Sequence, residues 1–134
     1  MNGYSGTPLA AKLGFKPGQR ACYVNPPENF EQLLGELPDG VKLLGRPGRD
    51  MDLVVAFVTA RADFERRLGA LRRALAPAGM LWIAWPKRAS GVPTDMTEDV
   101  VRDVALPTGL VDTKVAAIDE TWSGLRLVVR KELR

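Results

Sequence analysis

Residues 52–58, DLVVAFV, and residues 80–86, MLWIAWP, decide the fold of this chain. Both are continuous apolar runs, which is typical of strands that are covered on both faces of a parallel sheet. Residues 60–76 between them form a helix in our interpretation, because parallel neighbours require a crossover connection. Its apolar stripe consists of Phe64, Leu68, Leu71 and Leu75. Residues 77–79, PAG, are expected to close this helix, so the stretch predicts a strand–helix–strand unit at the centre of the sheet.

Shorter elements precede this unit. We expect a short helix over residues 8–13, a first strand over residues 20–24 and a short edge strand over residues 41–44. Between the two strands, Asn25 and Glu28 have the spacing of a capping box, with proline at the first helical position. The pattern therefore predicts a second helix that begins next to Asn25.

A helix and a hairpin follow the unit. Asp95 and Glu98 again have capping-box spacing, which predicts a helix that runs to about Leu106. Residues 111–118 and 125–131 read as two strands, and the short connection between them favours an antiparallel hairpin. We expect the last strand to lie between the central strand and its hairpin partner.

The composition limits the possible functions. With 134 residues and 46% hydrophobic residues, the chain is expected to be one globular domain, residues 1–134. The net charge of +3 permits an acidic ligand or nucleic acid without requiring either. No apolar run approaches membrane-spanning length and no secretory signal precedes the domain, so we expect a cytoplasmic protein without membrane contact.

The chain contains no histidine and one cysteine, Cys22, which lies in an apolar run and is expected to be a buried hydrophobe. The absence of histidine excludes imidazole acid–base catalysis, nucleophile activation by histidine and most types of zinc site. We therefore name no catalytic residue, no metal and no cofactor.

The order of elements resembles the Rossmann-like fold of S-adenosylmethionine-dependent methyltransferases, shortened by one helix–strand unit. Residues 13–18, LGFKPG, resemble the approach to the first strand of those enzymes, and residues 75–81, LAPAGML, resemble the approach to their central strand. Residues 110–130 resemble their final hairpin. The resemblance implies a three-layer α/β domain with a mostly parallel sheet and a C-terminal antiparallel β-hairpin.

Over its full length the chain also resembles an uncharacterised bacterial family, a domain of unknown function. Residues 90–102, SGVPTDMTEDVVR, and residues 122–126, WSGLR, carry this resemblance. It implies no activity.

The chain departs from the methyltransferases where their cofactor binds. Their first strand ends in a Gly-rich turn, whereas residues 23–27 here are YVNPP. The two prolines remove backbone N–H donors that an anionic ligand would use, and Asn25 can occupy another donor. The family's acidic residue after the second strand is also missing, because residues 45–47 are GRP. We therefore expect weak or absent binding of S-adenosylmethionine in the usual pose.

Three functions remain open. The first is a non-catalytic Rossmann-like module that binds a small ligand or a protein partner. The second is a divergent methyltransferase that binds its cofactor in an altered way. The third is a nucleic-acid-associated protein that uses a basic helix face made of Arg61, Arg66, Arg67, Arg72 and Arg73. No aromatic residues interleave with these arginines to stack bases, which favours an ordinary solvated face.

Ligands of open α/β sheets bind outside the carboxyl ends of the strands. The candidate ligand-binding residues at this edge are Asn25, Thr59, Lys87, Ser90, Thr94, Asp95, Asp119, Trp122, Ser123 and Arg126. We expect Lys87 and Arg126 to hold an anion, the hydroxyl groups to orient it and Trp122 to stack on a flat group. In the alternative, Asp95 only caps its helix, Trp122 belongs to the core and the charges pair with one another.

Overall fold

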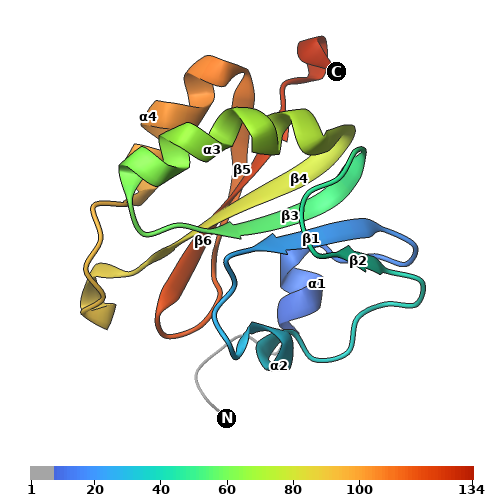
Figure 1. The fold of residues 1–134 in the computed structure, drawn as a ribbon, viewed down its shortest axis with the longest axis horizontal. Helices are drawn as coiled ribbons and strands as arrows, with labels where there is room; N and C mark the ends of the chain where they lie inside the picture. The colour runs from blue at the N-terminus through green and yellow to red at the C-terminus, as the bar shows by residue number, and fades with distance from the viewer. Residues whose placement is uncertain (1–7) are drawn as a thin grey trace.

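A six-stranded sheet with helices on both faces forms the fold of this computed structural model, which describes residues 8–134 (Figure 1). The helices are α1 (Leu9–Leu13), α2 (Phe30–Leu34), α3 (Arg61–Ala74) and α4 (Glu98–Ala105). The strands are β1 (Arg20–Val24), β2 (Lys42–Leu44), β3 (Met51–Phe57), β4 (Leu75–Pro86), β5 (Leu110–Ala117) and β6 (Trp122–Val129). Three short 3₁₀ turns follow Lys87, Ala105 and Arg130. The expected three-layer α/β architecture is confirmed.

The order of the strands in the sheet is β2-β1-β3-β4-β6-β5. The pairs β1–β2, β1–β3 and β3–β4 are parallel, and β6 is antiparallel to both β4 and β5. The apolar runs 52–58 and 80–86 are therefore neighbours at the centre of the sheet, as their two-sided hydrophobicity predicts. The last strand lies between the central strand and its hairpin partner, which confirms the second expectation.

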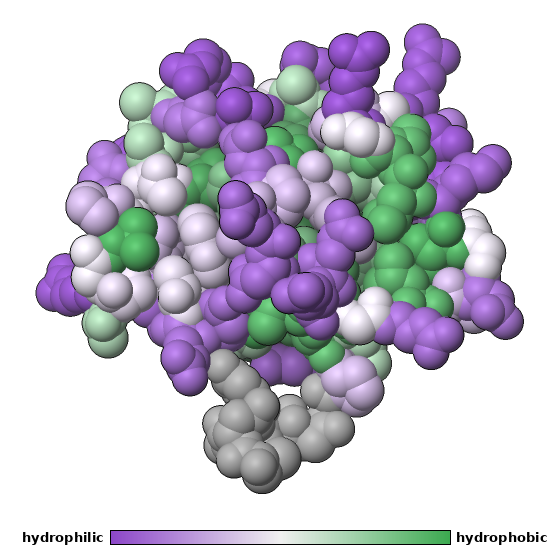
Figure 2. Space-filling view, turned by 60° about the horizontal axis from the view of Figure 1, so that its bottom comes forward, coloured by the Kyte–Doolittle hydropathy of each residue, from purple (hydrophilic) through white to green (hydrophobic). Residues whose placement is uncertain are grey.

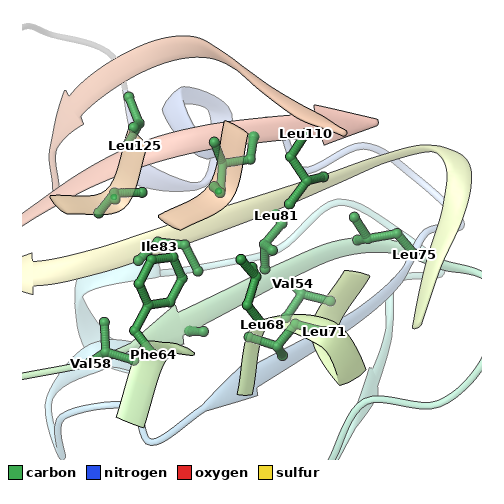
Figure 3. Close-up of a cluster of buried hydrophobic side chains, with 14 of the residues drawn as sticks. Val54, Val58, Phe64, Leu68, Leu71, Leu75, Leu81, Ile83, Leu110 and Leu125 are labelled. Carbon is green, nitrogen blue, oxygen red and sulfur yellow. The ribbon is translucent and has the colours of Figure 1, made fainter. Parts of the chain in front are cut away.

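Two hydrophobic clusters lie on the two faces of the sheet. On one face, Phe64, Leu68 and Leu71 of α3 pack over strand residues that include Val54 and Ile83 (Figure 3). Helix α4 adds its buried residues to the same cluster. Successive side chains of a strand point to opposite faces, so alternate residues of β4 serve the two clusters.

Helices α1 and α2 cover the other face (Figure 1). The fully buried Trp82 packs there, and its indole N–H donates a hydrogen bond of 2.7 Å to the carbonyl oxygen of Leu13 at the end of α1. This bond satisfies the one polar atom of a large buried side chain. Figure 2 brings this side forward and shows hydrophobic surface in areas that hydrophilic side chains separate.

The expected helix next to Asn25 is wrong, because α2 begins only at Phe30. Asn25 has a φ of 52°, in the left-handed region, and the N-cap of α2 is Asn29, whose side chain makes no capping hydrogen bond. Consecutive prolines explain the difference, since a residue that precedes proline is disfavoured in the helical region, and Pro26 precedes Pro27. The result is an irregular turn after β1 and a helix of a single turn.

The central helix ends earlier than the sequence predicts. It stops at Ala74, so Leu75 belongs to a strand and not to the apolar stripe of the helix. Residues 77–79 belong to β4, which begins at Leu75 directly after α3. The pairing of β4 with β3 shifts register between Met51 and Leu53, and this irregularity accommodates the extra residues. No helix of residues 8–134 is both long and apolar enough to cross a membrane.

Candidate functional site

An open hollow of about 700 Å³ lies where β4 ends and α4 begins. Most of its lining residues belong to the segment between these two elements, and Ser123 of β6 completes the lining. The polar groups that line it come from Lys87, Arg88, Thr94, Asp95, Thr97, Glu98 and Ser123, and Trp85 and Met96 supply apolar surface. The hollow is therefore at the carboxyl edge of the sheet, where ligands of such sheets bind.

Lys87 joins the hollow to the β5–β6 hairpin. Its backbone N–H donates to the carbonyl oxygen of Thr121 at 2.7 Å, and its ammonium donates to that of Asp119 at 2.8 Å. Ser90 then shapes the loop, because its hydroxyl donates to the Lys87 carbonyl and accepts from the N–H of Val92. An ammonium has three donors, and the Asp119 carbonyl uses one of them.

Asp95 fixes the opposite wall of the hollow. Its carboxylate accepts a hydrogen bond of 2.7 Å from the backbone N–H of Arg61, the first residue of α3. The residue before α3 is Ala60, which has no side-chain acceptor for the N–H groups at the start of the helix. The carboxylate of Asp95, distant in sequence, therefore acts as the acceptor at this helix N-terminus, where negative charge is also favourable. Beside it, the Thr94 hydroxyl donates to the Thr59 carbonyl at 2.5 Å.

The interpretation that Asp95 caps its own helix is therefore wrong. The N-cap of α4 is Thr97, whose hydroxyl accepts from the N–H of Val100 at 3.1 Å. The carboxylate of Glu98, the first residue of α4, instead lies 2.6 Å from the guanidinium of Arg102. Thr97 is not among the residues predicted from the sequence, although a threonine directly before an acidic first turn is an ordinary N-cap signal.

The structure brings most of the expected residues together. Lys87, Thr94, Asp95 and Ser123 line one hollow. Thr59 and Asp119 adjoin it through the two backbone carbonyl contacts described above, and Ser90 lies in its loop. Asn25 is not part of it, because Asn25 follows β1 and β3 lies between β1 and β4.

Arg126 and Trp122 do not face the hollow, so the expected anion clamp of Lys87 and Arg126 is wrong. The guanidinium of Arg126 lies 6.0 Å from the centre of the Trp82 ring and donates to the Thr113 hydroxyl at 2.8 Å. Residues 122, 124 and 126 share one face of β6, whereas Ser123 points to the other. Arg126 thus belongs to the face that α1 and α2 cover.

Four aromatic rings form a chain near the carboxyl ends of β1 and β3. Tyr23, Phe30, Phe57 and Trp122 contact each other edge to face, with successive ring centres 4.8, 4.9 and 5.0 Å apart. Phe30, the first residue of α2, is fully buried in this chain. Trp122 is partly buried and packs against the hydrophobic cluster under α1 and α2, which agrees more closely with the alternative interpretation than with a ligand-stacking role.

The hollow carries groups of both charge signs and several hydroxyls. Lys87 and Arg88 lie among its lining residues together with Asp95 and Glu98. These groups can hold a polar molecule by hydrogen bonds, while Trp85 and Met96 contact an apolar portion. Within residues 8–134 there is no cluster of three or more cysteine, aspartate or glutamate residues arranged to hold a metal ion.

No protein-family model matches the chain, and no curated protein matches it in sequence. Its fold is similar to that of a methyltransferase from Aquifex aeolicus, described as dependent on S-adenosylmethionine, with a TM-score of 0.65 and 17% identity over 90% of this chain and 88% of that one. A putative type 11 methyltransferase from Sulfolobus solfataricus gives a TM-score of 0.58 and 14% identity over 84% and 85% of the two chains.

Fibrillarin from Aeropyrum pernix, solved with natively bound S-adenosyl-L-methionine, gives a TM-score of 0.57 and 15% identity over 90% of this chain and 73% of that one. These likenesses show a Rossmann-like, methyltransferase-like α/β fold.

Proposed function

We propose that this chain is a non-catalytic Rossmann-like module that binds a small polar ligand in the hollow at the carboxyl end of β4. The turn after β1 carries this proposal. Its two prolines lack N–H donors, Asn25 is left-handed, and α2 begins only at Phe30, whose side chain is fully buried. Methyltransferases of this fold, as the sequence resemblance implies, receive their cofactor at a Gly-rich turn in that position.

The hollow supports the binding role. Its volume falls within the roughly 300–1,000 Å³ of ordinary small-molecule sites. Its walls are held by hydrogen bonds from three separate segments of the chain, so the site is formed before any ligand binds. Lys87 and Ser123 supply donors for a polar group, and no histidine is present to move a proton.

A divergent methyltransferase is the second candidate, and the likeness to solved methyltransferases over most of the chain favours it. In that case S-adenosylmethionine would occupy the hollow in an altered pose. The nucleic-acid alternative has less support, because Asp63 accepts from both Arg66 and Arg67, and Arg61 pairs with Glu65. These pairs leave less of the basic face free for phosphates. The non-catalytic module, our first candidate, could equally bind a protein partner instead of a small ligand.

Thermal unfolding with S-adenosylmethionine, nucleotides, acyl-CoA and a short RNA separates these candidates. A ligand at about 100 times its Kd raises the free energy of unfolding by about 2.7 kcal/mol, which shifts the melting temperature. We expect no shift with S-adenosylmethionine. Calorimetry that gives a micromolar or tighter Kd for it, with the adenosine across Asn25, would overturn this part of the proposal.

A compound that does raise the melting temperature then tests the location. Lys87→Met is expected to abolish the shift, whereas the control Lys131→Met, which removes the same charge from an exposed turn near the other end of the sheet, is expected to keep it. If both variants bind like the original protein, the ligand site is not this hollow.

A further inference from the structure

The connection from β2 to β3 leaves part of one sheet face without a helix. β1 lies between these two strands, and residues 45–50 cross it as a loop, whereas α3 makes the next crossover. A groove of about 390 Å³ lies between this loop and α3. Val24, Leu71 and Ala74 contribute apolar side chains to it, of which Leu71 and Ala74 are buried core residues.

Three arginines line the same groove. Arg46 comes from the loop, and Arg67 and Arg73 come from α3. No carboxylate is among its lining residues, all of which lie in the described part of the chain. Arg67 pairs with Asp63, which it shares with Arg66, while Arg46 and Arg73 form no ion pair with any other residue of the range 8–134. The groove therefore has an excess of positive charge beside apolar surface.

We infer that this groove binds a small organic phosphate, with the phosphate on the guanidinium groups and an apolar or flat body on Leu71 and Ala74. Guanidinium groups match phosphate oxygens with paired N–H donors and stay charged at every physiological pH. A dianionic phosphate monoester balances the two arginines that have no carboxylate partner. The volume suits a small molecule, since it lies within the roughly 300–1,000 Å³ of such sites. This inference does not depend on the hollow at the end of β4.

Calorimetric titration with phenyl phosphate and with inorganic phosphate tests the inference. Phenyl phosphate carries both halves of the expected ligand, so we expect it to bind about tenfold more tightly than inorganic phosphate, because only phenyl phosphate buries a ring. Arg46→Gln and Arg73→Gln are each expected to raise the Kd of phenyl phosphate about tenfold. Both side chains are exposed, so melting temperatures without ligand are expected to stay the same.

Arg66→Gln is the matched control. It removes one positive charge from the same helix, its side chain is 71% exposed, and it pairs with Asp63 outside the groove. We expect it to change the Kd less than about twofold, because Arg66 does not line the groove and a charge without direct contact to the ligand is screened at physiological salt. Lys87→Met is likewise expected to leave phenyl phosphate binding intact, which separates this groove from the hollow.

Three results would overturn the inference. One is no heat of binding with phenyl phosphate at millimolar concentration. Another is an equal loss of affinity in Arg66→Gln, which would mean attraction by the general charge of the helix. The third is tight binding of a short RNA that Arg66→Gln weakens as much as Arg73→Gln does, which would assign the basic face to nucleic acid.

Discussion

The surroundings of Tyr23 determine the pKa of its hydroxyl group. Its ring contacts Phe15 and Phe30 edge to face, and its hydroxyl oxygen is buried without a hydrogen-bond partner within residues 8–134. Burial, together with the smaller effects of the charges of Glu31 and Cys22, raises the pKa of Tyr23 to about 12. The folded chain therefore holds this proton more tightly than the unfolded chain does.

We predict that Tyr23 ionises near pH 12 in the folded state and near its ordinary value of about 10 in urea. The chain has two tyrosines, so Tyr4→Phe isolates Tyr23 for titration by phenolate absorbance. Because the folded pKa is the higher one, the related stability is complete below about pH 10 and is lost as the pH rises toward 12. Tyr23→Phe should remove this part of the alkaline loss. A native titration near pH 10 without unfolding would contradict the prediction.

Among the elements, the first part of strand β4 depends on a glycine. A Cβ atom on Gly79 would collide with the backbone oxygen of Met51, in the neighbouring strand β3. Backbone cannot move aside as a flexible side chain can. Gly79 therefore permits the close approach that the register shift between β3 and β4 requires.

We predict that Gly79→Ala destabilises the protein by about 1–3 kcal/mol, because the added methyl group overpacks this contact. Urea denaturation measures the change. Gly45→Ala is the control, since a Cβ there meets no atom within 4 Å. If the two variants have the same free energy of unfolding, β3 and β4 can move apart at Gly79 without destabilising the protein, and the prediction fails.

Helix α4 is tied to β5 by a charged contact. The guanidinium of Arg102 donates to the carboxylate of Asp112 at 2.9 Å and also pairs with Glu98 on its own helix. The hydrogen bond from Arg102 holds the pKa of Asp112 below its ordinary value, and it outweighs the opposing effect of burial. The related stability is present above that ordinary value and is lost as the pH falls through the folded pKa.

We predict that Arg102→Met returns the pKa of Asp112 toward its ordinary value, as measured by NMR titration of the carboxyl carbon. The variant should also be less stable than the original protein at neutral pH, and the two should become more alike in acid. Arg130→Met, which breaks an exposed pair with Glu132 at 3.7 Å, should leave the pKa of Asp112 unchanged. A shift of similar size in this control would mean that the effect is not local.

The order and pairing of the elements could be predicted because they depend on patterns within short segments. Two-sided apolar runs indicate central strands, and a short polar connection indicates a hairpin. The errors in the arrangement of the candidate site residues concern contacts between segments that are distant in sequence. Asp95 serves the helix at Arg61 rather than its own, which spacing along the chain cannot reveal. Arg126 points away from Lys87 because of the strand register, which only the folded sheet defines.

In the whole molecule, both hydrophobic clusters share one sheet. Alternate residues of β3 and β4 belong to the cluster under α3 and α4 and to the cluster under α1 and α2. Loss of either cluster therefore exposes the strands that the other one needs. The expectation of a single domain remains a prediction that this arrangement makes testable.

We predict one cooperative unfolding transition. Far-ultraviolet circular dichroism reports both layers of helices, and tryptophan fluorescence reports the neighbouring strands β4 and β6 through Trp82, Trp85 and Trp122. The two urea curves should coincide, since two-state unfolding is usual for single domains of this size. Separate midpoints would mean that the layers unfold independently.

The place of β6 beside the central strand has a consequence for synthesis on the ribosome. Residues 122–129 are translated after every other described strand, yet they supply the neighbour of β4. Until they emerge, β4 presents an unpaired edge with the buried side chains of Trp82 and Ile83 on its two faces. Such an edge invites wrong pairing. We therefore expect the nascent chain to be prone to wrong pairing along β4 until residues 122–129 have been made.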